Sequence, residues 1–199
     1  MPKIRAKIIG DQIWTTENLS RAEYQQITRR NLPIKNDRWV EHQDPKCYAY
    51  ESAIKKKKEY LFDINALLFL RANSPLWRIP DTKDLDRLFR TIDPNAGYFN
   101  ETIRLAKDMR GTYGWENNGV NKVGFNAYPN PTLDENGLRE FEISRWWYNN
   151  EQHASLDGFS VYEDDIVATS GPFAENIGLA IRLVMDLTDP RVEENLYYV

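Results

Sequence analysis

The sequence IGLAIRLVMD, residues 177–186, has the strongest β-strand pattern in the chain. Large apolar side chains occupy every second position, and smaller or polar residues separate them. Successive side chains of a strand point to opposite faces, so this period of two predicts a strand with one buried face. Arg182 lies on the opposite face, where we expect an acidic partner for it.

The other end of the chain predicts a pair of strands. Residues 4–9, IRAKII, alternate apolar and basic side chains, and Gln12–Thr16 is rich in β-formers. Gly10-Asp11 between them is a typical hairpin turn. The chain therefore begins and ends in predicted β-structure.

The helical signals lie between these ends. Asp81–Ile92 is the clearest helix, because Asp81 or Thr82 can cap it and its apolar residues form one stripe. That stripe consists of Leu85, Leu88, Phe89 and Ile92. Glu101–Arg110 predicts a second, weaker helix, and residues 64–71 predict a buried helical turn. Residues 21–47 are polar and irregular, which predicts a long loop or an insertion.

The character of the chain changes after Gly111, where glycine, asparagine and proline become frequent between aromatic residues. This mixture favours short strands and long loops. We find no internal repeat and no low-complexity linker in the sequence. The prediction is one α+β domain over residues 1–199, with a core of about 8–186 and a tail at 187–199.

Composition excludes several classes of protein. The 199 residues include one cysteine, Cys47, so no intrachain disulfide can form, and we expect an unreactive buried thiol. The longest apolar run, Ala66–Leu70, is far shorter than the roughly 20 residues that span a bilayer. The first residues lack the apolar core of a signal peptide. We therefore expect synthesis in a cytoplasm and no membrane insertion.

The net charge of −4 conceals an uneven distribution. Residues 1–110 contain 21 Lys and Arg against 15 Asp and Glu, a net +6, whereas residues 111–199 contain 5 against 15, a net −10. The two halves can neutralise each other inside one fold. Alternatively, the chain docks between partners of opposite charge.

No sequence motif marks a catalytic, nucleotide or metal site. The two histidines are 111 positions apart, and no phosphate-binding glycine loop or serine-hydrolase motif occurs. We therefore predict no cofactor, no metal and no enzyme activity, although a pair of unmarked carboxylates remains an alternative. The acidic residues Asp157 and 163–165 favour a solvated loop over a calcium site, because the DxDxDG spacing is missing. The run Lys55–Lys58 favours a solvated turn over nucleic-acid binding.

Residues 111–153 combine aromatic rings with amides, a composition that fits a sugar-contacting surface. We expect Trp115, Phe125 and Trp147 in the core and Tyr113 and Tyr148 at the surface. The candidate ligand or partner surface consists of Tyr113, Asn117, Asn118, Asn121, Tyr148, Asn149 and Asn150. The candidate assembly contacts are Arg29, Arg30, Lys55, Lys56, Lys57, Lys58, Tyr197 and Tyr198.

The order of the motifs resembles the Fibrobacter succinogenes major paralogous domain family, often called FISUMP. The opening IGDQIWTTENLS resembles its G-x-x-W-x-x-x-N-L segment, and WRIPD at 77–81 resembles its W-R-L-P-T entry to a helix. GW at 114–115, NG at 118–119 and GFNAYP at 124–129 follow the family's order, as do YAYESA at 48–53 and RWW at 145–147. IGLAIRLVMD resembles its closing G-x-S-V-R-C-V-x-D strand.

This resemblance implies a C-type-lectin-like fold, related to the formylglycine-generating enzyme. In that fold the two terminal strands pair, two helices lie in the first half, and long loops with short strands form the ligand surface. The formylglycine-generating relatives depend on a cysteine pair, which this chain lacks. Calcium-dependent lectins use Glu-Pro-Asn and Trp-Asn-Asp triplets, and neither occurs here.

Bacterial members of the family are typically exported modules of larger proteins, whereas this sequence starts at a plain methionine without a signal. We therefore expect a non-enzymatic structural or adhesion subunit of a phage virion, which docks on other protein subunits as a homo- or hetero-oligomer. A glycan-binding module that recognises bacterial surface polysaccharide is the alternative function. An extracellular or cell-surface location by a non-Sec route is the alternative setting.

Overall fold

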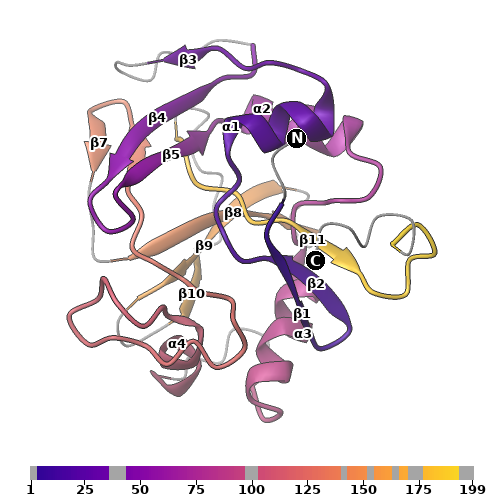
Figure 1. The fold of residues 1–199 in the computed structure, drawn as a ribbon, viewed down its shortest axis with the longest axis vertical. Coiled ribbons are helices and arrows are strands. Elements are labelled where there is room, and N and C mark those ends of the chain that lie inside the picture. The colour runs from indigo at the N-terminus through magenta and orange to yellow at the C-terminus, as the bar shows by residue number, and fades with distance from the viewer. Residues whose placement is uncertain are drawn as a thin grey trace.

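The fold is α+β, with helices and small, mostly antiparallel sheets (Figure 1). The computed structural model describes residues 4–35, 44–96, 103–139, 143–151, 155–162, 166–169 and 177–192. Its helices are α1 (Arg21–Thr28), α2 (Ile64–Asn73), α3 (Thr82–Ile92) and α4 (Ile103–Met109). The predicted α+β class is confirmed, but the first half contains at least three helices, α1, α2 and α3, and not the two that the resemblance implied.

The two ends of the chain share one sheet, as the resemblance implied. Strand β2 (Gln12–Thr15) lies between β1 (Ala6–Ile9) and β11 (Val184–Asp186), and both neighbours are antiparallel to it. Gly10 adopts the left-handed φ of +64° in the predicted turn between β1 and β2. The terminal strand pairing is therefore confirmed (Figure 1).

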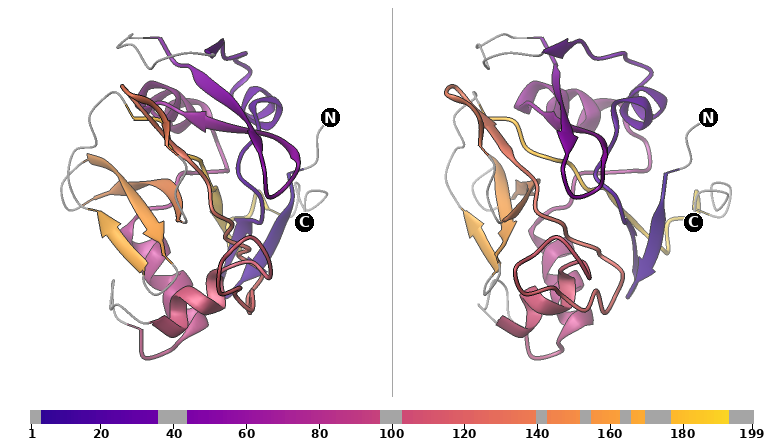
Figure 2. Two further views of the ribbon diagram at one scale, coloured as in Figure 1. Left: turned by 90° about the vertical axis from the view of Figure 1, so that its left-hand side faces the viewer. Right: turned by 60° about the vertical axis from the view of Figure 1, so that its left-hand side comes forward.

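The segment 177–186 is extended, but only its last three residues form a regular strand. Single β-bridges join Gly178 to Leu133, Leu179 to Phe62 and Ala180 to Trp146. The prediction of one continuous strand is therefore wrong, because this segment bridges three separate elements in turn. Figure 2 shows it in yellow, passing through the middle of the molecule.

Both faces of this segment are buried, not one. Leu179, Ile181 and Leu183 belong to one hydrophobic cluster, which includes residues of α1 and α2. Ala180 and Val184 belong to a second cluster, which includes residues of α3, α4 and β8. The segment therefore separates two halves of the core and packs against both.

The sheet around β5 forms the upper part of Figure 1. Its strands are β3 (Ile34–Lys35), β4 (Cys47–Ser52) and β5 (Lys57–Phe62), in the order β3-β4-β5. The predicted helical turn at 64–71 corresponds to α2, which follows directly after β5.

Helix α1 corrects the expectation of a long loop or insertion at 21–47. Its first turn is fixed by a capping box, in which Glu23 N donates to Ser20 Oγ and Ser20 N donates to a Glu23 carboxylate oxygen. Only Tyr24 and Thr28 of this helix are buried, so the sequence shows no apolar stripe. Tyr24 Oη donates to Ala66 O at 2.8 Å and thereby joins α1 to α2.

The second half consists of short strands and long loops, as predicted. Strands β8 (Ser144–Asn150), β9 (Ser155–Val161) and β10 (Ile166–Thr169) form one sheet, and β6 (Thr132–Asp134) pairs with β7 (Gly137–Arg139). The predicted stripe of α3 is buried throughout: Leu85, Leu88, Phe89 and Ile92.

Arg182 is completely buried, and the prediction of an acidic partner is wrong for the described residues. Its Nη1 donates to Thr15 O at 2.8 Å and to Phe125 O at 3.2 Å. Nη2 donates to Asn126 O at 3.1 Å, and Nε donates to Asn18 Oδ1 at 3.0 Å. Burial lowers the pKa of Arg182 to about 10, so the side chain keeps its charge at neutral pH.

Asp84 joins α3 to the terminal sheet. Its side chain is fully buried and accepts hydrogen bonds from Gln12 Nε2 at 2.7 Å and Arg87 Nη2 at 2.8 Å, as well as from Arg78. Arg78 and Arg87 also bind Asp186 of β11, at 2.8 and 2.7 Å. A buried carboxylate that neutralises two arginines is costly to remove, because the arginines lose their partner.

We predict that Asp84→Asn lowers the free energy of unfolding by roughly 2–4 kcal/mol. Urea denaturation followed by circular dichroism measures this change. Asp86→Asn on the same helix is the matched control, since Asp86 pairs with the exposed Arg90, and its expected cost is below about 1 kcal/mol. Equal effects of the two substitutions would contradict the role of Asp84.

Candidate functional site

The candidate contact surface is the loop between α4 and β6, residues 111–128, which we call the long loop. Its backbone is fixed to the end of α4: Val120 N donates to Lys107 O at 3.0 Å, and Lys122 N donates to Asp108 O at 2.8 Å. Gly111 N donates to Ala127 O at 2.7 Å, which closes the base of the loop. The bonds to Lys107 O and Asp108 O satisfy carbonyls at the end of α4 that would otherwise lack partners.

The long loop also has its own small core. Trp115 is buried, and its Nε1 donates to Ala127 O at 2.9 Å. Arg110 lies 5.3 Å from the Trp115 ring centroid and donates to Asn117 O at 2.7 Å. The predicted core positions Trp115, Phe125 and Trp147 are all buried, which confirms that part of the sequence analysis.

The outer side of the long loop presents several of the predicted contact residues. Tyr113 is 47% exposed and Val120 is 50% exposed, and Asn117 and Asn118 are also exposed. Asn121 instead supports the loop from within, because its amide side chain bonds both the backbone and the side chain of Asn126.

The remaining predicted contact residues lie elsewhere, on β8. Tyr148 is only 1% exposed, so the expectation that it lies at the surface is wrong. Asn150 is buried and donates to Asp157 Oδ2 at 2.7 Å. The backbone of Asn149 donates to Pro80 O, next to the start of α3. Tyr148 and Asn150 are therefore structural, whereas the Asn149 side chain is half-buried.

The predicted acidic loop is described only at its first member. Asp157 is buried in β9 and binds Asn150 and Ser155, so the expectation of a solvated loop is wrong at this residue. Residues 163–165, His42 and His153 lie outside the described residues. Within the described part of the chain, no three His, Cys, Asp or Glu side chains are grouped as metal ligands would be.

The lysine run at 55–58 is not a uniformly solvated turn. The Lys55 side chain is only 5% exposed, and its Nζ lies 2.8 Å from Glu17 Oε2 and 3.1 Å from Glu59 Oε1. It also lies 4.8 Å from the centroid of the Tyr128 ring. Lys55 is therefore excluded as an exposed assembly contact and instead joins the β4–β5 hairpin to the long loop.

The hairpin and the long loop are in close contact at one further point, beside a ring pair within the loop. Gly114 adopts a φ of +88°, and a Cβ there would lie 2.9 Å from the Ile54 side chain. Tyr113 packs on Tyr128 with ring centroids 4.6 Å apart. Tyr113 is thus held on a surface formed jointly by the long loop and the hairpin.

A polar pocket of about 260 Å³ lies beside Lys55, and we call it the Glu17 pocket. It is lined by Arg5, Glu17, Asn18, Leu19, Ser20, Glu23, Lys57, Lys58, Glu59 and Tyr60. Burial alone would raise the pKa of Glu17, but Lys55 and then Lys57 outweigh it and hold this pKa at about 2. The sequence analysis missed the pocket, because its residues come from three separate segments of the chain: Arg5, residues 17–23 and residues 57–60.

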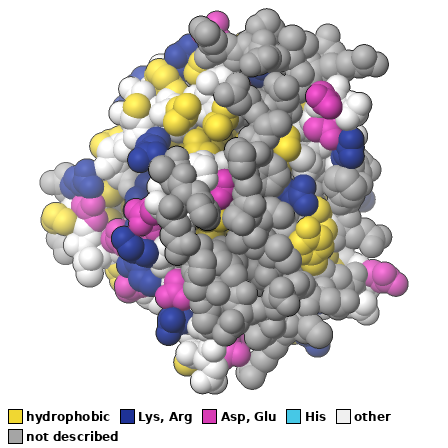
Figure 3. Space-filling view, turned by 180° about the vertical axis from the view of Figure 1, so that it is seen from behind, with side chains coloured by type: hydrophobic (Ala, Val, Ile, Leu, Met, Phe, Trp, Pro, Cys, Tyr) yellow, Lys and Arg dark blue, Asp and Glu magenta, His cyan; other side chains and the backbone are white. Residues whose placement is uncertain are grey.

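The other predicted assembly contacts are dispersed. Arg29 is exposed at the end of α1, and Arg30 lies 4.6 Å from the Phe69 ring centroid. Lys56, Lys57 and Lys58 are exposed. Tyr197 and Tyr198 lie outside the described residues. On the face in Figure 3, the described hydrophobic side chains form separate patches with charged side chains between them.

Cys47 is fully buried in β4, and burial raises the pKa of its thiol to about 12. An uncharged, inaccessible thiol is a weak nucleophile, which agrees with the predicted unreactive cysteine. Among the described residues, no helix is long and apolar enough to cross a bilayer.

A model of a known protein family matches most of the chain. The model of the Fibrobacter succinogenes major domain matches residues 8–185. The chain belongs to this family. No curated protein and no solved structure matches it.

In this family member, the low pKa of Glu17 predicts that its ion pairs with the β4–β5 hairpin make a pH-dependent contribution to stability. The folded-state pKa of Glu17 is about 2, below the ordinary 4.5. The ionised carboxylate therefore stabilises the fold fully above pH 4.5, and this contribution is lost as the pH falls toward 2. We therefore predict that Glu17→Gln is less stable than the wild type at pH 6 and that this difference closes on acidification. Denaturation curves between pH 2 and 6 test it; a constant difference would contradict it.

Proposed function

We propose that the protein is a non-enzymatic structural or adhesion module with a C-type-lectin-like fold, which docks on other protein subunits through the long loop. The family assignment and the pairing of β2 with β11 support the fold proposal. The irregular second half, with its long loop on a scaffold of helices and sheets, supports it further.

The observation that favours docking is the exposure of Tyr113 and Val120 on a firmly bonded backbone. Large apolar side chains at a surface are candidate binding anchors. A loop that already has its bound conformation loses little conformational entropy on association. Backbone hydrogen bonds fix the long loop to α4 while these two side chains remain about half exposed, which keeps the entropy cost of docking small.

The charged clusters support a non-catalytic role. Glu17 and Asp186 have lowered pKa values even though burial opposes the shift, because cations bind them. Burial does raise the pKa of Asp63, but this side chain caps α2 and is only 1% exposed. A general acid needs contact with substrate, and the position of Asp63 in the core does not provide it.

The setting that we propose is a phage virion, with the extracellular or cell-surface location as the alternative. The uneven charge supports a place between subunits, because a basic half and an acidic half can each face a neighbour of opposite sign.

Recognition of a bacterial polysaccharide is the second candidate function. The half-exposed Tyr113 ring, with the exposed Asn117 and Asn118 on the same loop, favours it. A ring can stack on the apolar face of a sugar while amides bind its hydroxyls.

The docking proposal predicts that the full chain self-associates or is incorporated into particles, and that Tyr113→Ser with Val120→Ser weakens this by about tenfold or more. Sedimentation velocity over a wide concentration range measures self-association, and blotting of purified particles measures incorporation. Leu68→Ser, an exposed apolar residue on α2, is the matched control and leaves both unchanged.

A chain that stays monomeric at all concentrations and is absent from particles would overturn docking. Binding to a glycan array that Tyr113→Ser alone abolishes would, in that case, support the second candidate function.

A further inference from the structure

Among the described strands, β5 has a free edge where it borders the Glu17 pocket. In the sheet order β3-β4-β5, the described part of the chain provides β5 with a strand on one side only. Phe62 directs its N–H and C=O away from β4, to Leu179, at 2.8 and 3.2 Å. In an antiparallel pair, every second residue directs these groups to the same side, so those of Tyr60 and Lys58 also point away from β4.

These outward backbone groups of Lys58 and Tyr60 have no hydrogen-bond partner among the described residues. Both residues line the Glu17 pocket. The pocket therefore borders a short row of backbone donors and acceptors that repeats every two residues, roughly 6.6–6.8 Å along a strand. An extended polypeptide has the same repeat.

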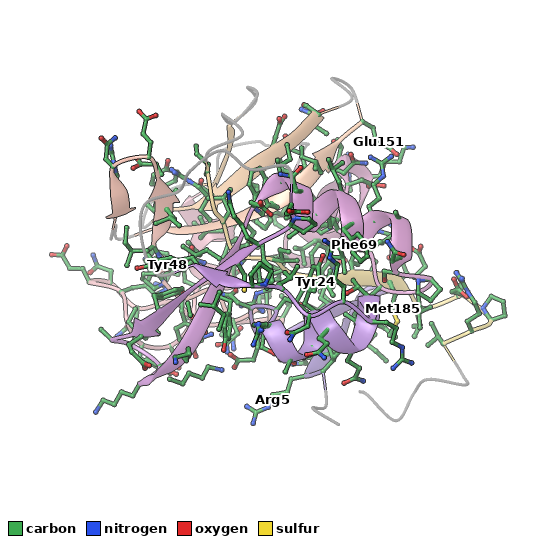
Figure 4. All side chains as sticks on the ribbon, turned by 90° about the horizontal axis from the view of Figure 1, so that it is seen from above. Arg5, Tyr24, Tyr48, Phe69, Glu151 and Met185 are labelled. Carbon is green, nitrogen blue, oxygen red and sulfur yellow. The ribbon has the colours of Figure 1, made fainter. Side chains whose placement is uncertain are left out.

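The charges of the pocket are not equally available. Its carboxylates are already bound: Glu17 by Lys55 and Lys57, and Glu59 by Lys55 and Tyr50. Glu23 accepts a hydrogen bond from the backbone of Ser20. In contrast, the side chains of Arg5 and Lys58 form no ion pair within the described part of the chain. Figure 4 shows the Arg5 side chain extending from the ribbon into solvent.

We propose that the edge of β5 at the Glu17 pocket binds an extended acidic segment of a partner protein by strand addition. Backbone groups of Lys58 and Tyr60 pair with the segment, and Arg5 and Lys58 bind its acidic side chains. This inference rests on the proposed docking function for the existence of a protein partner. The edge of β5 is a second docking surface, separate from the long loop, and the segment that binds there is extended and acidic.

A labelled synthetic peptide of alternating glutamate and valine is the probe, and fluorescence anisotropy with the full chain measures its binding. We expect saturable binding that Lys58→Glu and Arg5→Glu each weaken by about tenfold or more. Lys56→Glu is the matched control, because Lys56 is exposed on the same hairpin but outside the pocket, and it should change affinity by less than about twofold.

Two further probes separate strand addition from simple charge attraction. The same peptide with alternate backbone nitrogens methylated cannot complete the hydrogen-bond ladder, so we expect it not to bind. Oligogalacturonate presents carboxylates without a peptide backbone, and we expect it to bind more weakly than the peptide.

Three results would overturn the proposal: no binding of the peptide, an equal loss in Lys56→Glu and Lys58→Glu, or equal binding of the methylated peptide or the oligogalacturonate. The first would leave Lys57 and Lys58 as edge charges that prevent strand-to-strand aggregation. None of these results bears on self-association through Tyr113 and Val120, so failure here is distinguishable from failure of the docking function.

Discussion

The arrangement of this protein depends on the hydrogen bonds that the buried Arg182 guanidinium donates. A buried arginine is stable only when its donors are satisfied, and here every acceptor belongs to a different part of the fold from the arginine itself. Thr15 ends the opening hairpin and Asn18 follows it, while Phe125 and Asn126 belong to the long loop. The rings of Phe125 and Trp146 lie 5.2 and 5.6 Å from the guanidinium carbon and exclude water from it. One side chain thus joins the closing segment, the first hairpin, β8 and the candidate contact surface.

The position of Arg182 follows from the path of the closing segment. Residues 178–185 are buried on both faces and separate two hydrophobic clusters, so a polar side chain there must find its partners inside the protein. Uncharged carbonyl oxygens provide these partners, so these hydrogen bonds bury no second charge beside Arg182. This arrangement links two properties of the molecule, because the residue that completes the core also fixes the loop that we propose to dock on partners.

The sequence predicts those helices and strands whose apolar residues recur with a clear period. It does not predict burial that depends on segments far apart in the chain. The terminal strands, α3 and the buried ring of Trp115 follow from local pattern. Helix α1 has almost no apolar face, although Ser20 and Glu23 have the spacing of a capping box and could have revealed its start. The sequence places Tyr148 and Lys55 at the surface, because lysine is mostly exposed and tyrosine is often only partly buried. Their burial depends on how β8 is covered and on Glu17, 38 positions from Lys55.

Native-state hydrogen exchange of Arg182→Lys tests most directly whether this side chain fixes the long loop. A lysine keeps the charge but cannot reach acceptors in all these segments at once. We expect the amides of Gly119 and Ala127, which close the loop, to exchange about tenfold faster or more in this variant than in the wild type. The amides of Leu88 and Phe89 in α3 should change much less. Equal acceleration in the loop and in α3, or no change in either, would contradict the account.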